Sequence, residues 1–204
     1  MIRLAVDGGL WTVTLDRADK ANALTPEMLA ELSDIMGRAG EARALILTGA
    51  GRVFSAGADL DAARAGLATS PVWEELSARI AALPSLTIAA LNGTLAGGAF
   101  GMALACDLRI AVPGARFFYP VMRLGFLPQP SDPARLTALV GPARARMILM
   151  AGHRATAEEA LAWGLVDALH DGDALLDAAR TLAADALAAP PGHVGAIKRM
   201  VPGG

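Results

Sequence analysis

Cysteine, clustered charge and paired histidines are scarce in this chain of 204 residues. The single cysteine, Cys106, excludes an internal disulfide and is typical of a reducing compartment, so we expect a cytoplasmic protein. His153, His170 and His193 show no H-E-x-x-H or paired spacing, which predicts no metal site. The 18 basic and 20 acidic residues give a net charge of −2, which favours neither nucleic acid nor an acidic membrane as a partner.

Residues 80–106 have no charged side chain, and a run of that length raises the possibility of a membrane span. Pro84, the Asn-Gly pair at 92–93 and the Gly-Gly pair at 97–98 would each interrupt a single helix. We therefore expect a buried strand followed by a buried helix, and no membrane span. The N-terminus has Arg3 and no long apolar region, which is unlike a signal peptide.

Strands and helices alternate through most of the chain, and helices dominate its last third. Apolar alternation around a turn at 7–9 predicts a β-hairpin, and unbroken apolar runs predict strands covered on both faces. The expected strands are 2–6, 10–16, 43–49, 86–93, 107–112 and 115–119. The expected helices are 25–40, 70–83, 98–106, 131–141, 142–152, 156–165 and 173–187. Thr25, Ser70 and Thr156 are candidate N-caps, and Glu159 completes a capping box with Thr156.

This order of elements predicts an α/β fold with helices gathered toward the C-terminus. No segment is long or polar enough to act as a linker, so we expect one domain over residues 1–204.

Two glycine-rich turns, at 48–60 and 92–101, each follow a buried strand. Neither has the G-x-G-x-x-G or G-K-[ST] spacing of a phosphate-binding loop. Two backbone N–H groups from such turns can converge on one carbonyl oxygen and form an oxyanion hole. The glycines can equally serve only tight turns and close helix–sheet packing. From the residues alone, both interpretations stay open.

Four segments, in this order, resemble the crotonase, or enoyl-CoA hydratase/isomerase, superfamily. They are 15–32 (LDRADKANALTPEMLAEL), 43–60 (RALILTGAGRVFSAGADL), 86–111 (LTIAALNGTLAGGAFGMALACDLRIA) and 156–169 (TAEEALAWGLVDAL). The resemblance implies a spiral of ββα turns over about 1–130 and C-terminal helices over about 131–204. It implies an acyl-CoA ligand, with coenzyme A as part of that ligand and no permanently bound cofactor. It also implies a homotrimer or a dimer of trimers.

The same resemblance implies a set of site residues. The thioester oxygen would lie between the N–H groups of Ala58 and Gly98. The nucleotide and pantetheine would lie along 20–24 and 55–60, with Arg17 and Lys20 as candidate phosphate contacts, although an ordinary solvated loop explains these two equally well. The implied CoA-binding residues are Arg17, Lys20, Ala21, Ala23, Leu24, Ser55, Ala56, Ala58, Asp59 and Leu60.

Two catalytic positions depart from the hydratase pattern. Family hydratases place one glutamate three residues beyond the oxyanion glycine and another after a proline, where this chain has Gly101 and Val121. Neither residue can move a proton, so we expect no ordinary hydratase activity. Tyr119 is expected to be a packing aromatic, and Arg123 to face solvent or a subunit contact.

Gln129 aligns with a loop position that carries specialised chemistry in some members of the superfamily. It can hydrogen-bond a substrate but cannot be a nucleophile. Asp132 is the only carboxylate in the loop, and an N-cap before Pro133 is the alternative to a substrate role. Asp107 is expected to bind backbone amides or a nearby arginine such as Arg109.

Two classes of function remain. The first is an acyl-CoA-binding protein with an oxyanion hole and no hydratase acid/base pair. The second is an enzyme that stabilises an enolate, either a decarboxylase or a hydratase/isomerase with an unrecognised base. The C-terminal part is shorter than in longer members, which makes trimer formation and CoA affinity less secure.

Overall fold

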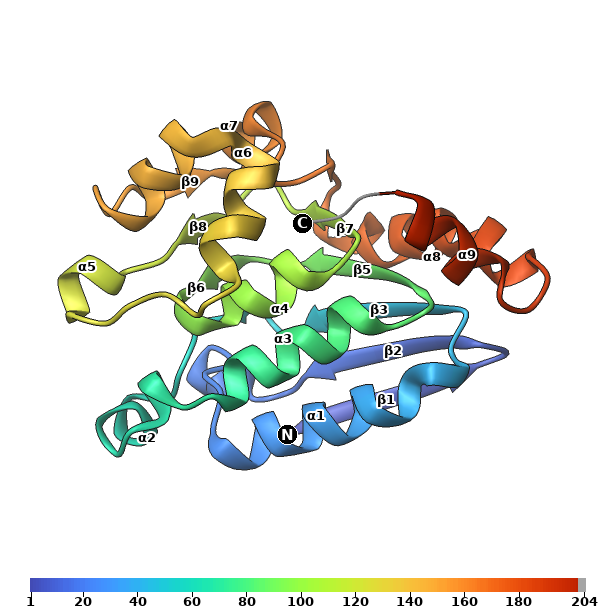
Figure 1. The fold of residues 1–204 in the computed structure, drawn as a ribbon, viewed down its shortest axis with the longest axis horizontal. Helices are drawn as coiled ribbons and strands as arrows, with labels where there is room; N and C mark the ends of the chain where they lie inside the picture. The colour runs from blue at the N-terminus through green and yellow to red at the C-terminus, as the bar shows by residue number, and fades with distance from the viewer. Residues whose placement is uncertain (202–204) are drawn as a thin grey trace.

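Two sheets lie side by side in the computed structural model, which describes residues 1–201 (Figure 1). The larger has six strands in the order β1-β2-β3-β5-β7-β10, and the smaller has four in the order β4-β6-β8-β9. The large-sheet strands are β1 (Ile2–Asp7), β2 (Leu10–Leu15), β3 (Ala44–Gly49), β5 (Leu86–Leu91), β7 (Leu108–Ala111) and β10 (Ala168–Leu169). The small-sheet strands are β4 (Val53–Ser55), β6 (Thr94–Ala96), β8 (Arg116–Phe118) and β9 (Ala155–Thr156).

The chain runs as a spiral, because β3, β5 and β7 each continue into the small sheet as β4, β6 and β8. The neighbouring pairs β3–β5, β5–β7, β4–β6 and β6–β8 are parallel, and only β1–β2 and β8–β9 are antiparallel among the described strands. Helices follow each small strand. This confirms the expected α/β fold of ββα turns followed by C-terminal helices.

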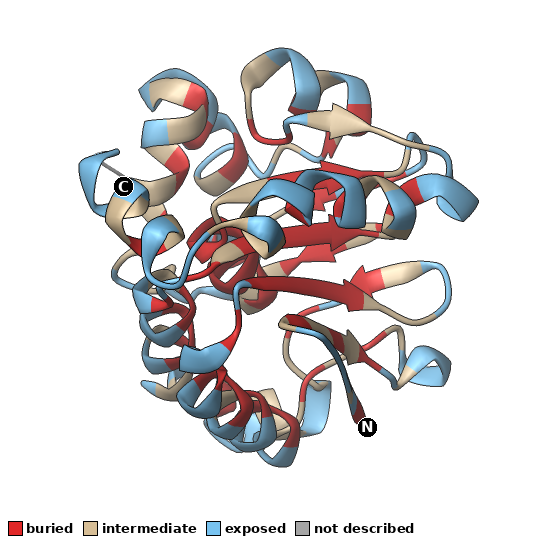
Figure 2. Ribbon diagram, turned by 90° about the vertical axis from the view of Figure 1, so that its right-hand side faces the viewer, coloured by how far each residue is buried: buried red, intermediate tan, exposed pale blue. Residues whose placement is uncertain are grey.

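The α-helices cover both faces of the large sheet (Figures 1 and 2). They are α1 (Pro26–Arg38), α2 (Leu60–Arg64), α3 (Val72–Ala82), α4 (Phe100–Ala105), α5 (Val121–Leu124), α6 (Asp132–Leu149), α7 (Ala157–Trp163), α8 (Leu175–Ala188) and α9 (His193–Met200). Short 3-10 turns are η1 (Ala18–Lys20), η2 (Ala39–Glu41), η3 (Leu67–Thr69), η4 (Gly97–Ala99) and η5 (Gly172–Ala174).

Strand β3 shows why the sheet is covered on both faces. Leu45 and Leu47 point into the core beneath α1, α3 and α4, whereas Ala44 and Ile46 join the cluster under α8. Successive side chains of a strand point to opposite faces of the sheet. A strand with an unbroken apolar run is therefore buried only if helices with apolar side chains pack on both faces. The large sheet is accordingly red through its centre in Figure 2.

Helix ends agree with the expectations in part. Thr25 accepts a hydrogen bond from the Met28 N–H, and Thr156 and Glu159 form the capping box. At α3 the boundary is assigned one residue later than expected, with Pro71 at the N-cap position. Ser70 is nevertheless extended, with ψ of 139°, and its hydroxyl accepts a weak hydrogen bond of 3.4 Å from the Val72 N–H, as a capping serine does.

The two helices expected over 131–152 are confirmed as two segments of α6. Gly141 has a non-helical conformation with φ of 77°, directly before Pro142. His193 begins α9, a helix that the sequence did not predict. No helix within residues 1–201 is long and apolar enough to span a membrane.

Candidate active site

The two glycine-rich turns meet at the junction of the two sheets. Gly57 has φ of +92°, and a Cβ atom built on it would lie 2.9 Å from the Ala96 carbonyl oxygen and 3.5 Å from the Gly98 nitrogen. Gly97, with φ of +59°, faces the Cα of Gly57. A side chain at Gly57 would separate these turns, so their close approach depends on this glycine.

Ala58 follows Gly57 and Gly98 follows Gly97, so these two half-buried residues flank the contact between the turns. Among the described residues, neither the Ala58 N–H nor the Gly98 N–H donates to a backbone carbonyl outside its own helix or strand. Paired free donors are what an oxyanion requires. The expected helix at 98–106 begins instead as the 3-10 turn η4, with α4 following from Phe100 to Ala105.

Trp73 fixes the position of Gly98. A Cβ atom on Gly98 would lie 3.2–3.3 Å from three carbons of the Trp73 indole, and the indole N–H donates to the Leu67 carbonyl at 2.8 Å. The sequence contained no direct signal for this contact, because Trp73 reads as an ordinary apolar position of α3.

The first turn is also held from the other side by residues 17–24. Leu24 donates to the Gly57 carbonyl at 2.7 Å and accepts from the Asp59 N–H at 2.8 Å, on either side of Ala58. Asn22 is fully buried, and its side-chain amide donates to the carbonyls of Ala50 and Val53. This packing orients the Ala58 peptide.

All ten residues expected at the CoA surface therefore lie in two segments that pack together. Their side chains differ in access. Leu24 and Ser55 are fully buried and expose neither side chain nor backbone, whereas Lys20 and Leu60 are exposed. Arg17 pairs with Asp59 at 2.8 Å and also donates to the Ala23 carbonyl. That ion pair lowers the pKa of Asp59, the N-cap of α2, and it makes Arg17 a brace for the two segments.

The two positions at which the resemblance implies glutamates in hydratases are both in the interior of the protein. Gly101 and Val121 are both buried. A Cβ atom on Gly101 would lie 3.0 Å from Asp132 Oδ1 and 3.6 Å from Ser77 Cβ. The carboxyl group of Asp132 thus occupies the space into which a side chain at 101 would extend.

Asp132 is fully buried and is not an N-cap, so that expectation was wrong. Ser131 is the N-cap residue of α6, and the Asp132 side chain points inward instead. The Tyr119 hydroxyl donates to Asp132 Oδ2 at 2.9 Å, and the Tyr119 ring stacks on Phe100 at 5.4 Å between centroids. Burial is the main cause that raises the pKa of Asp132 to about 7.

Gln129 lies beside this pair. Its backbone N–H donates to the Tyr119 hydroxyl oxygen at 3.4 Å, and its side chain forms no hydrogen bond with the described residues. Tyr119 is a packed aromatic with a satisfied hydroxyl, and Arg123 is exposed, as expected for both.

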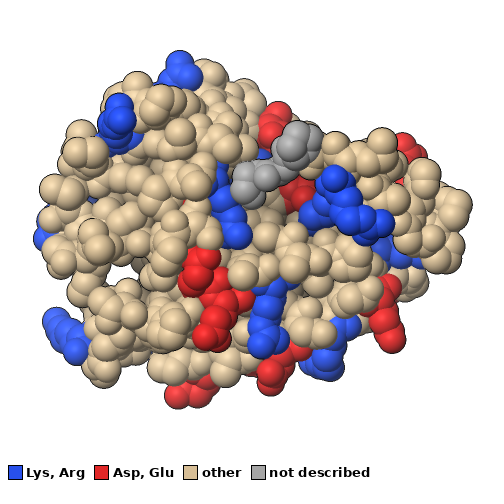
Figure 3. Space-filling view, viewed as in Figure 1, with Lys and Arg blue, Asp and Glu red and all other residues tan. Residues whose placement is uncertain are grey.

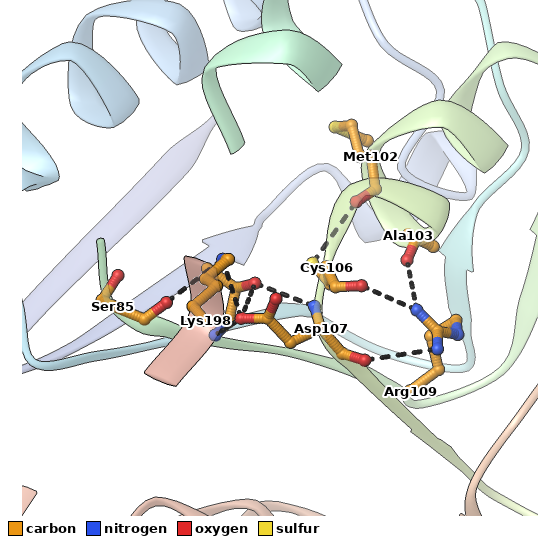
Figure 4. Close-up of polar contacts among 8 residues, drawn as sticks. Ser85, Met102, Ala103, Cys106, Asp107, Arg109 and Lys198 are labelled. Carbon is orange, nitrogen blue, oxygen red and sulfur yellow. Dashed lines mark hydrogen bonds and ion pairs between the residues drawn. The ribbon is translucent and has the colours of Figure 1, made fainter. Parts of the chain in front are cut away.

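A polar cluster closes the far end of α4 (Figure 4). Asp107 accepts from the Thr87 N–H at 2.8 Å and pairs with Lys198 at 2.8 Å, so its cation is Lys198 and not Arg109. Arg109 instead donates to carbonyl oxygens near the end of α4, including Cys106 at 2.7 Å. A cleft of ≈ 1110 Å³ opens at this end, away from the glycine turns.

The described residues contain no group of three or more His, Cys, Asp or Glu side chains that could hold a metal ion. On the face drawn in Figure 3, basic and acidic side chains are interspersed.

Comparisons with known proteins agree with this geometry. The family model for enoyl-CoA hydratase/isomerase matches residues 6–202. A 1,2-epoxyphenylacetyl-CoA isomerase from Escherichia coli is 33% identical over 96% of this chain and 79% of its own. A carnitinyl-CoA dehydratase from Citrobacter koseri is 37% identical over 95% of this chain and 77% of its own.

Solved structures give the same result. A putative enoyl-CoA hydratase/carnithine racemase from Magnetospirillum magneticum superposes with a TM-score of 0.91 at 30% identity, covering 100% of this chain and 83% of its own. An enoyl-CoA hydratase from Bacillus anthracis has a TM-score of 0.90 at 31% identity, covering 97% and 81%. Fold, turn geometry and sequence together show that this chain belongs to the enoyl-CoA hydratase/isomerase family, whose members act on CoA thioesters.

Proposed function

We propose that this protein binds an acyl-CoA and stabilises negative charge on its thioester oxygen with the N–H groups of Ala58 and Gly98. The observation that supports this proposal is the contact between the turns at Gly57 and Gly97, which half-buried Ala58 and Gly98 directly follow. Removing one such donor from other enzymes costs about 3–4 kcal/mol of transition-state stabilisation. Two donors to the same oxygen would both contribute to stabilising an enolate.

The CoA part would lie along the surface formed by 17–24 and 55–60. Lys20 is exposed and forms no ion pair among the described residues, so its ammonium group is available to a phosphate. Arg17 forms an ion pair with Asp59, and it would contribute by keeping segments 17–24 and 55–60 in contact. CoA affinity should therefore depend on the positive charge of Lys20, which would meet a phosphate. It should depend on Arg17 because this residue holds the two binding segments together.

Ordinary hydration is not part of the proposal. Gly101 and Val121 supply no carboxylate to activate water or to return a proton. The residues Gly101 and Val121 are compatible with acyl-CoA binding without hydration. They are also compatible with a reaction that needs only a stabilised enolate. Decarboxylation of a malonyl-type thioester is the second candidate, because the departing carboxylate itself supplies the electrons.

Titration calorimetry with butyryl-CoA and with free CoA tests the binding, and loss of the conjugated absorbance of crotonyl-CoA tests hydration. We expect butyryl-CoA to bind more tightly than free CoA, with no crotonyl-CoA turnover. Equal binding of the two would argue against the oxyanion hole. Rapid hydration would show that Gly101 and Val121 do not occupy the positions of the catalytic acid and base. Release of CO₂ from malonyl-CoA or methylmalonyl-CoA would select the decarboxylase alternative.

We also propose a homotrimer or a dimer of trimers. The support is the family relationship and the exposed apolar side chains of α9, which include Ile197 and Met200. Light scattering should give a mass of three or six chains, and a monomer would contradict this assignment.

A further inference from the structure

We propose that Asp132 is the catalytic acid/base of this site and transfers a proton at the acyl α-carbon, in place of a side chain at Gly101. This inference rests on the acyl-CoA function proposed above. It extends that function from binding to proton transfer, and it identifies enoyl-CoA double-bond isomerisation as the class of reaction.

The first support is the position of Asp132 Oδ1. This oxygen lies 3.0 Å from the Cβ position of Gly101 and has no hydrogen-bond partner among the described residues. A buried carboxylate oxygen without a partner is costly, and most such atoms in folded proteins are satisfied. Its companion Oδ2 is satisfied by Tyr119 at 2.9 Å, so the carboxyl group is held at one oxygen and free at the other.

The second support is the alignment of Asp132 with the oxyanion hole. Gly98 and Gly101 are three residues apart along η4 and α4, which is about one helical turn. An acyl group whose carbonyl oxygen binds the Gly98 N–H and which runs along this face would pass Gly101 within about a turn. Gly101 has no side chain, so the first functional group on that path is Asp132 Oδ1.

The third support is the electrostatic environment. The ionisable groups that act on Asp132 are Tyr119 from the segment after β8, Glu74 from α3 and Arg135 from α6. Arg135 donates to the Ser77 hydroxyl, and Glu74 accepts from the Ser131 N–H and hydroxyl. Burial outweighs the other contributions, so the pKa of Asp132 rises to about 7 and the group can both accept and return a proton near neutral pH.

The step is a reversible proton transfer. The ionised Oδ1 of Asp132 takes the α-proton, so the C–H bond breaks and an O–H bond forms. The electron pair moves onto the thioester oxygen, where the Ala58 and Gly98 N–H groups hold the enolate. With a 3-enoyl-CoA, the same carboxyl group returns the proton to the γ-carbon, and a 2-enoyl-CoA results. One group that first accepts and then donates is sufficient, whereas hydration also requires activation of a water molecule.

Access to Asp132 requires a local movement of the residues around it, because Asp132 is fully buried. Residues 122–130 precede α6 in the chain. This segment exposes Met122, Leu124 and Leu127, the last at 87%. A hollow of ≈ 300 Å³ borders Tyr119 and Met122, and it leaves space beside the segment. We expect the acyl chain to pack against these apolar side chains when it enters.

The experiment compares the protein with its Asp132→Asn and Asp173→Asn variants. Asp173 is an exposed aspartate in η5 and provides the matched control. Three readouts are used: calorimetric binding of butyryl-CoA, exchange of its α-protons with D₂O followed by proton NMR, and conversion of 3-hexenoyl-CoA to the conjugated 2-enoyl form. We expect Asp132→Asn to bind butyryl-CoA within about threefold of the parent and to lose about 100-fold or more of exchange and isomerisation.

A pH profile of exchange in the unsubstituted protein gives a test that does not depend on folding of a variant. Exchange should rise with pH and level off above about pH 7, as one carboxyl group ionises. Binding without exchange, or exchange that survives in Asp132→Asn, would overturn the role of Asp132 and leave the binding proposal intact. Absence of butyryl-CoA binding would overturn the proposed function itself.

Discussion

The carboxyl group of Asp132 lies against Gly101, with Oδ1 3.0 Å from the position of a Cβ atom on that glycine. The two residues are 31 positions apart and belong to α4 and α6. The absence of a side chain at Gly101 leaves space in the core, and the carboxyl group of Asp132 occupies that space. The family resemblance implies a hydratase glutamate at position 101, and the structure has the carboxyl group of an aspartate from another helix against that position.

Coupling between these two positions is the first prediction. Gly101→Glu alone should destabilise the protein, because its side chain would collide with Asp132. The double variant Gly101→Glu with Asp132→Gly removes that collision. We expect denaturant unfolding of the four proteins to give a favourable coupling free energy of about 1–3 kcal/mol. Strict additivity of the two changes would contradict the contact.

The pH dependence of stability is the second prediction. Folding raises the pKa of Asp132 from 3.8 to about 7, so the folded state holds this proton more tightly than the unfolded state. Its stabilising contribution is complete below about pH 4 and is lost as the pH rises toward 7, at about 1.4 kcal/mol per pH unit.

Urea unfolding of the parent and of Asp132→Asn from pH 4 to 8 measures this loss. The free energy of unfolding of the parent should fall relative to that of the variant as the pH rises, by a few kcal/mol over the interval. Parallel curves for the two proteins would show that Asp132 titrates normally.

The third prediction concerns Gly98. A methyl group there would press on the Trp73 indole, so Gly98→Ala should displace the turn and one donor of the oxyanion hole. We expect butyryl-CoA affinity to approach that of free CoA, together with a change in tryptophan fluorescence. Gly114→Ala is the matched control, because its Cβ atom would meet nothing within 4 Å. Equal loss in both variants would argue against a specific role of Gly98.

Cys106 provides the fourth prediction. The thiol is buried and donates to the Met102 carbonyl at 3.3 Å, and burial raises its pKa to about 12. Thiolate is the reactive form, so an aromatic disulfide reagent at pH 8 should leave the native protein unmodified and should titrate one thiol after denaturation. Rapid reaction of the native protein would show that the end of α4 opens readily.

Much of the fold follows from local signals in the sequence. The hairpin at 2–15, the helix capped by Thr25 and the break at Gly141-Pro142 each depend on turn or cap chemistry within a few residues. The small sheet was harder to predict, because β4 and β6 have only three residues each and pair across about 40 positions. Short strands like these have no periodicity of their own, and tertiary contacts alone define them.

The candidate site likewise has parts that could be predicted from the sequence and parts that could not. The resemblance identified the two turns and the segments beside them, and the structure brings these segments together. Asp132 stood in a sequence context typical of an N-cap, and its inward orientation depends on the empty space at Gly101. Trp73 behind Gly98 was not foreseen for the same reason. Contacts between separate helices leave no pattern within either helix.

Acetoacetyl-CoA provides a direct measurement of enolate stabilisation by the Ala58 and Gly98 N–H groups. This ligand forms an enolate with its own ultraviolet absorbance, and detection requires no catalytic turnover. We predict that the absorbance appears when the protein is titrated with acetoacetyl-CoA at neutral pH and is lost in Gly98→Ala. Binding of acetoacetyl-CoA without the enolate absorbance, or an equal signal in Gly98→Ala, would contradict the account.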